Sequence, residues 1–416
     1  MKHNGKLTVI GLGYIGLPTA VVFAENGWEV TGVDVLPLVV DMINKGHLPF
    51  VEEGLEDALA KVVEDGSLTA QLTTPESDTY IVSVPTPFKD GHQADLSYID
   101  AAADSIAPKL NGGELIVLES TSPPGTTEHM ANRILSARPD LTKDSSDPRP
   151  TVFFAHAPER VLPGRIMVEM VDNDRVIGGL TPEASEKARD VYATFCKGEL
   201  NVADAATAEL TKLVENSYRD VNIAFANELS LVAHELGVDV WELIDLANKH
   251  PRVNILQPGP GVGGHCIAVD PWFIVAADPD NTRLIRAARE VNDNKPSWVA
   301  AKVDAALADS PAGATVALLG LAFKPNIDDL RESPSLHLAL DLVTRRPDVE
   351  FLISEPNVEE LPEGLREASN VKAAGAEQAI DEADVVVLLV DHDPFKDIEK
   401  ERLSGKKVID TRGVWR

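Results

Sequence analysis

The chain has almost no cysteine: Cys196 and Cys266 are the only two among 416 residues. Two cysteines cannot form a disulfide framework, which indicates a reducing compartment and leaves each thiol free for other chemistry. No apolar run approaches the ~20 residues needed to cross a bilayer. The first residues, MKHNGKLTVIGLG, contain neither the apolar core nor the cleavage site of a signal peptide. These absences predict a cytoplasmic protein that does not enter a membrane.

Basic residues are also scarce. The chain has 38 Lys and Arg against 67 Asp and Glu, a net charge of −29. This balance disfavours nucleic acid and anionic membranes as partners, and an anionic substrate would need a locally basic pocket. The histidines show no metal-ligand spacing, so we expect no metal. The length exceeds one ordinary core and predicts two or three domains.

Strands and helices alternate in the first half of the chain. Apolar segments predict strands over 7–13, 28–35, 79–87, 114–126 and 151–160, with a helix over 17–27. A second and smaller alternating unit has strands predicted over 313–325, 349–356, 383–391 and 406–413. This pattern is typical of doubly wound parallel sheets, which bind ligands at the carboxyl ends of their strands. The two units are candidates for a distant internal repeat.

One long helix is predicted between these units, over 201–237, because the segment has no proline and ends in glycine. At about 100° per residue, Lys212, Asn216 and Arg219 fall on one stripe of this helix. The opposite side carries the apolar residues Leu210, Leu213, Val214, Val221 and Phe225. A solvated face is the plain interpretation of the polar stripe, and a helix this long often forms a dimer interface or a spacer.

The fold class is therefore α/β, with two Rossmann-like doubly wound domains joined by a long central helix. We place the boundaries at 1–200, 201–300 and 301–416.

The segment GLGYIG (11–16) has the G-x-G-x-x-G pattern between a predicted strand and helix. In this pattern Gly11 makes the tight turn, Gly13 admits a pyrophosphate and Gly16 permits close helix packing. Asp34 follows about 20 residues on, where an acid binds the ribose. Because a carboxylate repels a 2′-phosphate, NAD is predicted over NADP.

The segment PGPGVGGHCIAVDPWF (258–273) places four glycines and two prolines before Cys266, and Asp270 follows four residues later. A tight turn around a small buried hydrophobe is the plain alternative. A dehydrogenase that only removes a hydride from an alcohol needs no thiol. A thiol becomes useful when an aldehyde is oxidised further, through a thiohemiacetal and a thioester. An NAD site with such a cysteine therefore predicts a four-electron oxidation of an alcohol to an acid.

Several segments, in one order along the whole chain, resemble the nucleotide-sugar dehydrogenases that oxidise C6 of UDP-sugars to uronic acids. They are GLGYIGLP, SVPTP, ESTSPPGTT, APERVLPG, ELTKLVENSYRDVNIAFANE, GPGVGGHCIAVDPWF, GLAFKPNIDDLRESP and DTRGVWR. The resemblance implies an N-terminal NAD domain, a homodimer formed through the central helix, and a C-terminal UDP domain.

The resemblance also implies roles for individual residues. Cys266 is the nucleophile, Lys212 stabilises an oxyanion or exchanges a proton, and Asn216 and Asp270 position water and the lysine. Thr121 and Glu159 resemble a pair that activates water, although an ST-turn and a helix cap are their plain interpretations. The candidate cofactor residues are Gly11, Gly13, Tyr14, Ile15, Gly16, Asp34, Thr86, Thr121 and Arg331. The candidate substrate residues are Arg160, Val161, Lys212, Asn216, Arg219, His250, Arg252, Gly263, Phe323, Lys324 and Arg416, with Arg252 reaching the partner subunit.

The cysteine loop departs from the UDP-glucose branch of this family, which has GGSC where this chain has GGHC. His265 and the IAVDPWF that follows Cys266 resemble the branch that acts on 2-acetamido sugars. Within that branch the resemblance favours UDP-N-acetyl-D-mannosamine as the substrate, for surface polysaccharide synthesis. Four alternatives stay open. The substrate could be the N-acetylglucosamine epimer or UDP-glucose, and the protein could be a two-electron hydroxyacid dehydrogenase or a catalytically silent nucleotide-sugar sensor.

Overall fold

The computed structural model describes residues 4–50, 52–89, 92–162, 164–264, 266–311 and 313–416. It divides the chain into two compact units, one ending at Glu215 and the other beginning at Asn216. The boundary falls within the long helix α8 (Ala205–Glu235). We expect a central helix in this position from the sequence, and the structure confirms it. His265 lies outside the described residues.

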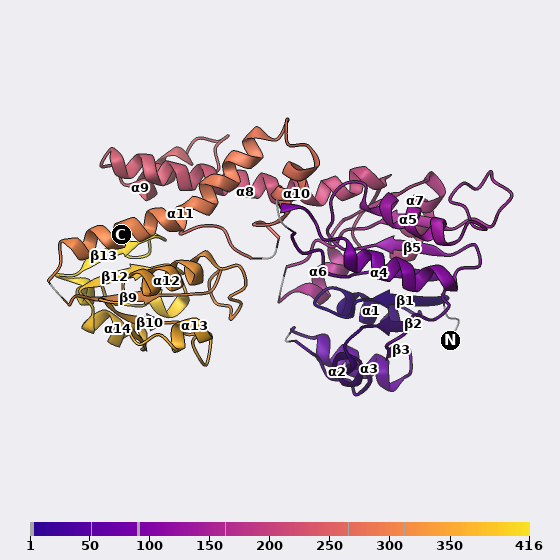
Figure 1. The fold of residues 1–416 in the computed structure, drawn as a ribbon, viewed down its shortest axis with the longest axis horizontal. Coiled ribbons are helices and arrows are strands. Elements are labelled where there is room, and N and C mark those ends of the chain that lie inside the picture. Colours follow the sequence, from indigo (N-terminus) through magenta and orange to yellow (C-terminus); the bar gives the residue numbers. More distant parts are fainter. Residues whose placement is uncertain (1–3, 51, 90–91, 163, 265, 312) are drawn as a thin grey trace. The chain divides into compact units, whose positions relative to one another are not determined.

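The first unit contains one eight-stranded sheet in the order β3-β2-β1-β4-β5-β6-β7-β8 (Figure 1). β1 pairs in parallel with β2 and β4, so that Ile10 lies opposite Val33 and Val82. The strands are β1 (Lys6–Ile10), β2 (Glu29–Val33), β3 (Leu68–Gln71), β4 (Thr79–Val82), β5 (Leu115–Leu118), β6 (Phe153–His156), β7 (Arg175–Gly179) and β8 (Leu200–Asp204). The first six strands have the order of a dinucleotide-binding fold.

Helices cover both faces of this sheet because successive side chains of each strand point to opposite sides. Leu7, Val9 and Ile81 pack in one core cluster with residues of α1 (Gly16–Glu25), α2 (Pro37–Asn44), α3 (Leu55–Glu64), α6 (Ile166–Asp172) and α7 (Pro182–Tyr192). Ile10 and Val82 pack in another with α4 (Ser97–Ile106) and α5 (Thr126–Ala137). The apolar runs in the sequence are therefore strands buried on both faces.

The second unit contains a five-stranded parallel sheet in the order β11-β10-β9-β12-β13. Its strands are β9 (Thr315–Leu319), β10 (Glu350–Ser354), β11 (Val371–Ala373), β12 (Val385–Leu388) and β13 (Lys407–Asp410). Its helices are α9 (Val240–Ala247), α10 (Asp270–Ala277), α11 (Arg283–Ala308), α12 (Pro334–Arg345), α13 (Glu363–Arg366), α14 (Ala376–Glu382) and α15 (Asp393–Lys396). The strand order repeats that of β3-β2-β1-β4-β5, as an internal repeat would.

Two expectations need correction. The first sheet is not wholly parallel, because β7 pairs antiparallel with β6. The central helix begins at Ala205, since 201–204 belong to β8. Asp204 ends that strand, and its carboxylate accepts hydrogen bonds from the Thr207 N–H at 2.9 Å and hydroxyl at 2.8 Å. Across the part of the chain that the structure describes, each helix is too short or too polar to cross a membrane.

Candidate active site

The glycines of the first loop are required by its geometry. Gly11 has φ +92°, and a Cβ there would lie 2.3 Å from the Ser83 carbonyl oxygen. A Cβ at Gly16 would lie 1.9 Å from the Gly11 carbonyl oxygen, whereas a Cβ at Gly13 would meet nothing within 4 Å. The loop therefore turns at Gly11, packs at Gly16 and is open at Gly13, which fits a cradle for a pyrophosphate.

The start of α1 also fits a dinucleotide. No side chain caps this helix at Ile15, and its first turn contains no acidic residue. Its N–H groups therefore face no built-in anion, and a phosphate would be favoured there. Asp34 lies at the carboxyl end of β2, where its carboxylate accepts the Leu12 N–H at 3.0 Å and the Leu36 N–H at 2.9 Å. The Tyr14 hydroxyl donates to Glu52 at 2.9 Å.

The loops after β4 and β5 are tied together. The Thr86 hydroxyl donates to the carbonyl oxygen of Thr121 at 2.6 Å. Ser120 strengthens the link, since its hydroxyl accepts from the Val84 N–H at 2.9 Å and donates to the Val84 carbonyl oxygen at 2.7 Å. The structure thus brings Thr86 and Thr121 together beside the glycine loop, at the carboxyl ends of neighbouring strands.

Glu159 belongs to a buried charged cluster. One of its oxygens accepts from the Arg175 guanidinium at 2.7 Å and the other from the Arg160 N–H at 2.8 Å. Glu119, at the end of β5, accepts from the hydroxyls of Thr19 at 2.9 Å and Tyr192 at 3.2 Å. Burial and the nearby charge of Glu159 raise the pKa of Glu119 to about 7. Glu119 and Arg175 carry no role in the sequence analysis.

Two further predicted residues flank this cluster. The Arg160 side chain forms an ion pair with Glu215 and also donates to the carbonyl oxygen of Asp174. Val161 packs against the core of the first unit. Lys212 is half-buried on α8.

The cysteine loop lies in the second unit, and its glycines have a packing role. A Cβ at Gly263 would lie 2.5 Å from the Glu332 carbonyl oxygen and 2.9 Å from the Phe323 Cβ. Gly264 has φ +86°, and a Cβ there would lie 2.9 Å from the Phe323 ring. Cys266 follows this close contact and is exposed. The loop therefore presents the thiol on a backbone held against Phe323, and the interpretation of a buried hydrophobe fails.

Asp270 begins α10 and is buried. Its carboxylate accepts a hydrogen bond from the Asn216 side-chain amide at 2.5 Å, and its N–H donates to the Cys266 carbonyl oxygen at 2.8 Å. The structure thus brings Asn216, Asp270 and the backbone of Cys266 together. Arg219 lies near Asn216 in the sequence but is exposed.

The remaining predicted residues lie in three places in the second unit: substrate candidates after α9 and after β9, and the cofactor candidate Arg331. His250 and Arg252 are exposed after α9, and the Arg252 N–H donates to His250 Nδ1 at 3.3 Å. Phe323 and Lys324 are half-buried after β9. Arg331 is exposed and forms an ion pair with Asp329 at 2.6 Å.

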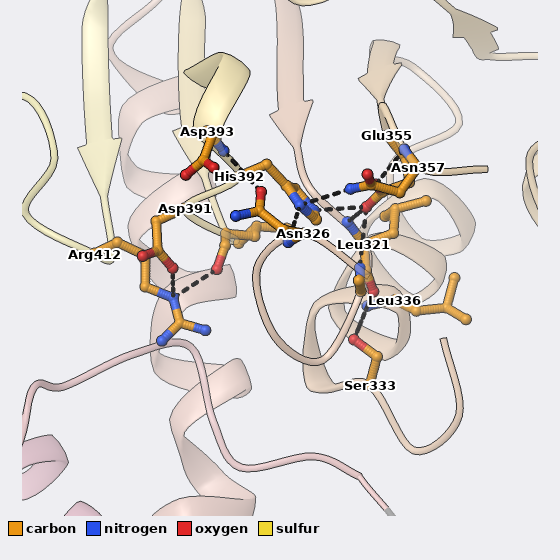
Figure 2. Close-up of polar contacts among 12 residues, drawn as sticks. Leu321, Asn326, Ser333, Leu336, Glu355, Asn357, Asp391, His392, Asp393 and Arg412 are labelled. Carbon is orange, nitrogen blue, oxygen red and sulfur yellow. Dashed lines mark hydrogen bonds and ion pairs between the residues drawn. The ribbon is translucent and has the colours of Figure 1, made fainter. Parts of the chain in front are cut away.

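The two arginines of DTRGVWR have different surroundings. Arg416 forms an ion pair with Asp245 at 3.1 Å and stacks 5.9 Å from the Trp241 ring centre. Arg412 lies beside the cysteine loop, since a Cβ at Gly259 would be 2.7 Å from its guanidinium. It also donates to the Leu389 carbonyl oxygen at 3.1 Å. Figure 2 shows its ion pair with Asp391, at 3.6 Å. Arg412 is therefore a better candidate than Arg416 for a basic group beside the cysteine loop, and its position at the end of the last predicted strand, 406–413, is the signal that could have found it.

Figure 2 shows a polar network at the carboxyl end of the second sheet. One oxygen of Glu355 accepts the Leu321 N–H at 2.7 Å, the Ala322 N–H at 3.1 Å and His392 Nε2 at 3.1 Å. His392 Nδ1 accepts the Asn326 N–H at 2.9 Å, which leaves the ring proton on Nε2. Burial alone would raise the pKa of Glu355, but these hydrogen bonds hold it below its ordinary value.

Comparison with known proteins identifies the family of the chain. Three models of the UDP-glucose/GDP-mannose dehydrogenase family match in order: the NAD binding domain over residues 5–196, the central domain over 206–294 and the UDP binding domain over 317–416. The fold and the three matched domains are those of a nucleotide-sugar dehydrogenase, an oxidoreductase with an NAD-binding Rossmann domain. The chain belongs to the UDP-glucose/GDP-mannose dehydrogenase family.

Individual relatives cover nearly the whole chain. The UDP-N-acetyl-D-mannosamine dehydrogenase of Salmonella typhi is 54% identical over 418 residues, with 99% of each chain covered. The NDP-N-acetyl-D-galactosaminuronic acid dehydrogenase of Ralstonia nicotianae is 52% identical over 410 residues, covering 98% of this chain and 96% of its own. The structure of a UDP-D-ManNAc dehydrogenase from Pyrococcus horikoshii has a TM-score of 0.86 at 37% identity, covering 99% of this chain and 96% of that one.

Proposed function

We propose that this protein oxidises C6 of UDP-N-acetyl-D-mannosamine to the carboxylate with two equivalents of NAD, for the synthesis of a surface polysaccharide. The observation that carries the chemistry is the exposed Cys266. Its backbone is bonded to Asp270, and Asp270 accepts a 2.5 Å hydrogen bond from the Asn216 amide. The identity of 54% to a UDP-N-acetyl-D-mannosamine dehydrogenase supports the choice of sugar.

The proposed role of Cys266 is covalent. Its thiolate adds to the C6 aldehyde, and oxidation of the resulting thiohemiacetal gives a thioester. Water then attacks the thioester carbonyl, which releases the carboxylate and restores the thiol. NAD, when bound, accepts one hydride in each of the two oxidations. The residues that fit its binding are Gly11, Gly13, Gly16 and Asp34.

The other predicted residues stabilise charge and handle water. We propose that Lys212 stabilises the developing oxyanion, a contribution that is large in a dry site. Asn216 and Asp270 fix the backbone around the thiol, since Asp270 bonds both to the Asn216 amide and to the Cys266 carbonyl oxygen. Glu159, with Thr121, is the proposed activator of the hydrolytic water.

We propose a homodimer through α8. Within the second unit this helix exposes Tyr218, Phe225 and Val232, with exposed fractions from 48% to 72%, and the exposed Leu236 directly follows it. A row of exposed large apolar residues on one helix is typical of a surface that a partner covers. Light scattering coupled to size exclusion tests this, and a monomer at micromolar concentration would contradict it.

The deciding experiment measures NADH formed per mole of sugar and kcat/KM with several UDP-sugars. We expect two NADH per sugar and a preference for UDP-N-acetylmannosamine over UDP-glucose, because a site that hydrogen-bonds an acetamido group rejects a ligand lacking it. One NADH per sugar would support a two-electron dehydrogenase, and no turnover would support a sensor. Preference for the N-acetylglucosamine epimer, or for the N-acetylgalactosamine sugar suggested by the Ralstonia relative, would change the substrate and leave the mechanism intact.

Replacing the thiol tests the covalent step. Cys266→Ser should abolish acid formation, since a serine alkoxide is much harder to generate than a thiolate. Cys196→Ser is the matched control, because Cys196 is half-buried against the carbonyl oxygens of Asn173 and Gly198 and has no proposed chemistry. Normal acid production by Cys266→Ser would overturn the covalent mechanism.

A further inference from the structure

The C-terminal unit contains a cavity that has no role in the proposed reaction. Its volume is about 280 Å³, and it lies among the end of α8, the connection to α9, α11 and the turn after β13. Ser230, Trp241, Lys295, Trp298 and Thr411 are among the residues that line it. The volume is near the lower end of the range for small-molecule sites.

Lys295 gives this cavity a buried positive charge. Its residue is only 4% exposed, its ammonium contacts the Ser230 hydroxyl, and it lies 4.2 Å from the Trp298 ring centre. Among the described residues it forms no ion pair, and burial lowers its pKa to about 8 with no opposing carboxylate. At pH 7 it is therefore still cationic. A buried charge without a counterion is unfavourable and favours an incoming anion.

Further basic groups gather on the same tryptophan. Lys302 lies 4.9 Å from the Trp298 ring centre and contacts His234 Nε2, and the His234 ring is 5.7 Å from the Trp298 ring. Basic residues are outnumbered in this chain, 38 to 67. A basic cluster of this kind is therefore unusual for its overall charge.

The two acids that line the cavity are already engaged by the backbone. Asp239 caps α9 by accepting the N–H groups of Trp241 at 2.8 Å and Glu242 at 3.1 Å. Asp410 accepts three N–H groups, those of Arg412 at 2.9 Å, Gly413 at 2.7 Å and Trp415 at 2.8 Å. Neither carboxylate contacts Lys295 within the described contacts, so the lysine has no direct ion pair with either of them.

We propose that this cavity is an effector site for a small organic anion. Its carboxylate or phosphate oxygens bind the Lys295 ammonium, which the Ser230 hydroxyl holds in place, while its body packs on Trp298 and Trp241. A cationic and aromatic lining recognises an anionic group attached to a flat or sugar-sized body.

The cavity is linked to the cysteine loop through described contacts. Pro258, the first residue of that loop, lines it. The next residue, Gly259, donates its N–H to the Asn227 side chain of α8 at 2.9 Å. Thr411 lines the cavity and directly precedes Arg412, which lies against Gly259. Occupancy is therefore expected to change turnover as well as stability, and this part of the inference rests on the proposed function.

Inorganic phosphate is the probe, titrated at pH 7 with chloride balancing the ionic strength while tryptophan fluorescence is recorded. We expect a saturable change in the wild-type protein and at least tenfold weaker binding in Lys295→Met. Lys372→Met is the matched control, because Lys372 is an exposed lysine of the same unit paired with Glu350. Ser230→Ala, a milder change, should also weaken the binding. If wild type and Lys295→Met bind phosphate with the same affinity, the proposed effector site is refuted, because phosphate bound at the nucleotide sites does not depend on Lys295.

Raising the pH gives a second measurement on the unmodified protein. The part of the phosphate binding that is lost in Lys295→Met should weaken above about pH 8, as the lysine loses its proton. If that part does not weaken, the anion is not bound by the lysine. In steady-state assays, phosphate should change kcat or KM of the wild type by a Lys295-dependent amount, and no such change would overturn the link to the cysteine loop. Lys295-dependent binding to a protein that turns over no UDP-sugar would refute the proposed function and leave the site standing.

Discussion

The buried carboxyl of Glu119 makes the stability of the first unit depend on pH. Its pKa rises from an ordinary value of 4.5 to about 7, first because it is buried and second because Glu159 lies nearby, while Arg175 acts in the opposite direction. The folded state thus holds this proton more tightly than the unfolded state. The resulting stabilisation is fully present below pH 4.5 and is lost as the pH rises through 7. The change in pKa corresponds to about 3 kcal/mol.

Glu119→Gln tests this magnitude, because the amide has the same shape and cannot ionise. It still offers an oxygen to the hydroxyls of Thr19 or Tyr192, which now bond the carboxyl. The free energy of unfolding of wild type minus that of the variant should fall by about 3 kcal/mol between pH 4.5 and pH 8. Titrating groups that do not interact with Glu119 cancel in this difference.

Hydrogen exchange of peptides from β5 and α7 is the suitable assay, since one global midpoint does not describe a chain with two units. Glu64→Gln, at the exposed end of α3, is the control and should show no such trend. A difference between wild type and Glu119→Gln that stays constant across this pH range would refute the assignment of the raised pKa to Glu119.

Three further changes test the site. Asp34→Ala should weaken NAD binding and partly relieve the discrimination against NADP, and unchanged NAD affinity in a binding titration would remove the ribose assignment. Lys212→Ala should lower kcat by about 10²–10⁴ with a smaller effect on KM, whereas turnover within about threefold of wild type would make it a surface residue. Asn227→Leu removes the partner of the Gly259 N–H and should destabilise the second unit by about 1–3 kcal/mol in urea unfolding, with loss of turnover. Unchanged stability would show that the Gly259 N–H finds another partner.

Most strands that the sequence predicted are well buried, and in β4, β5 and β12 every residue is buried. β13 was also predicted, although none of its residues is fully buried. The strands it missed are short or partly exposed, such as β8, where no residue is fully buried, and the edge strand β11. Such strands are held by pairing with a neighbour, and local periodicity carries little of that information. The start of α8 had a usable local signal, since Asp204 followed by Thr207 is a helix-capping pattern.

For the site, the sequence predicted which residue types take part better than it predicted which residues contact one another. Cys266 and Asp270 were selected for their residue types, and Asn216 for its place on the helix stripe and by the resemblance. A 2.5 Å hydrogen bond joins Asn216 to Asp270. The glycines before the thiol suggested backbone freedom, yet Gly263 and Gly264 are required because Phe323, some 60 residues away, packs on them. Arg412 was passed over for the same reason, since its place beside Gly259 depends on how β13 joins its sheet.

The two Rossmann-like domains share the same glycine turn and the same acid after the next strand, but the acid has a different environment in each. Gly11 and Gly320 follow the first strand of their sheets with φ of +92° and +90°. In each domain an acid after the next strand, Asp34 or Glu355, accepts the N–H of the residue that follows this glycine. Asp34 accepts two backbone N–H groups in the described contacts and stays half-exposed, whereas Glu355 is buried and also bonds Ala322, Asn357 and His392. A carboxylate has about four acceptor positions, so Asp34 keeps capacity for a ribose and Glu355 does not. The second domain therefore retains the turn of a dinucleotide fold, but its acid is used to close the loop, and a nucleotide there must be recognised by other groups.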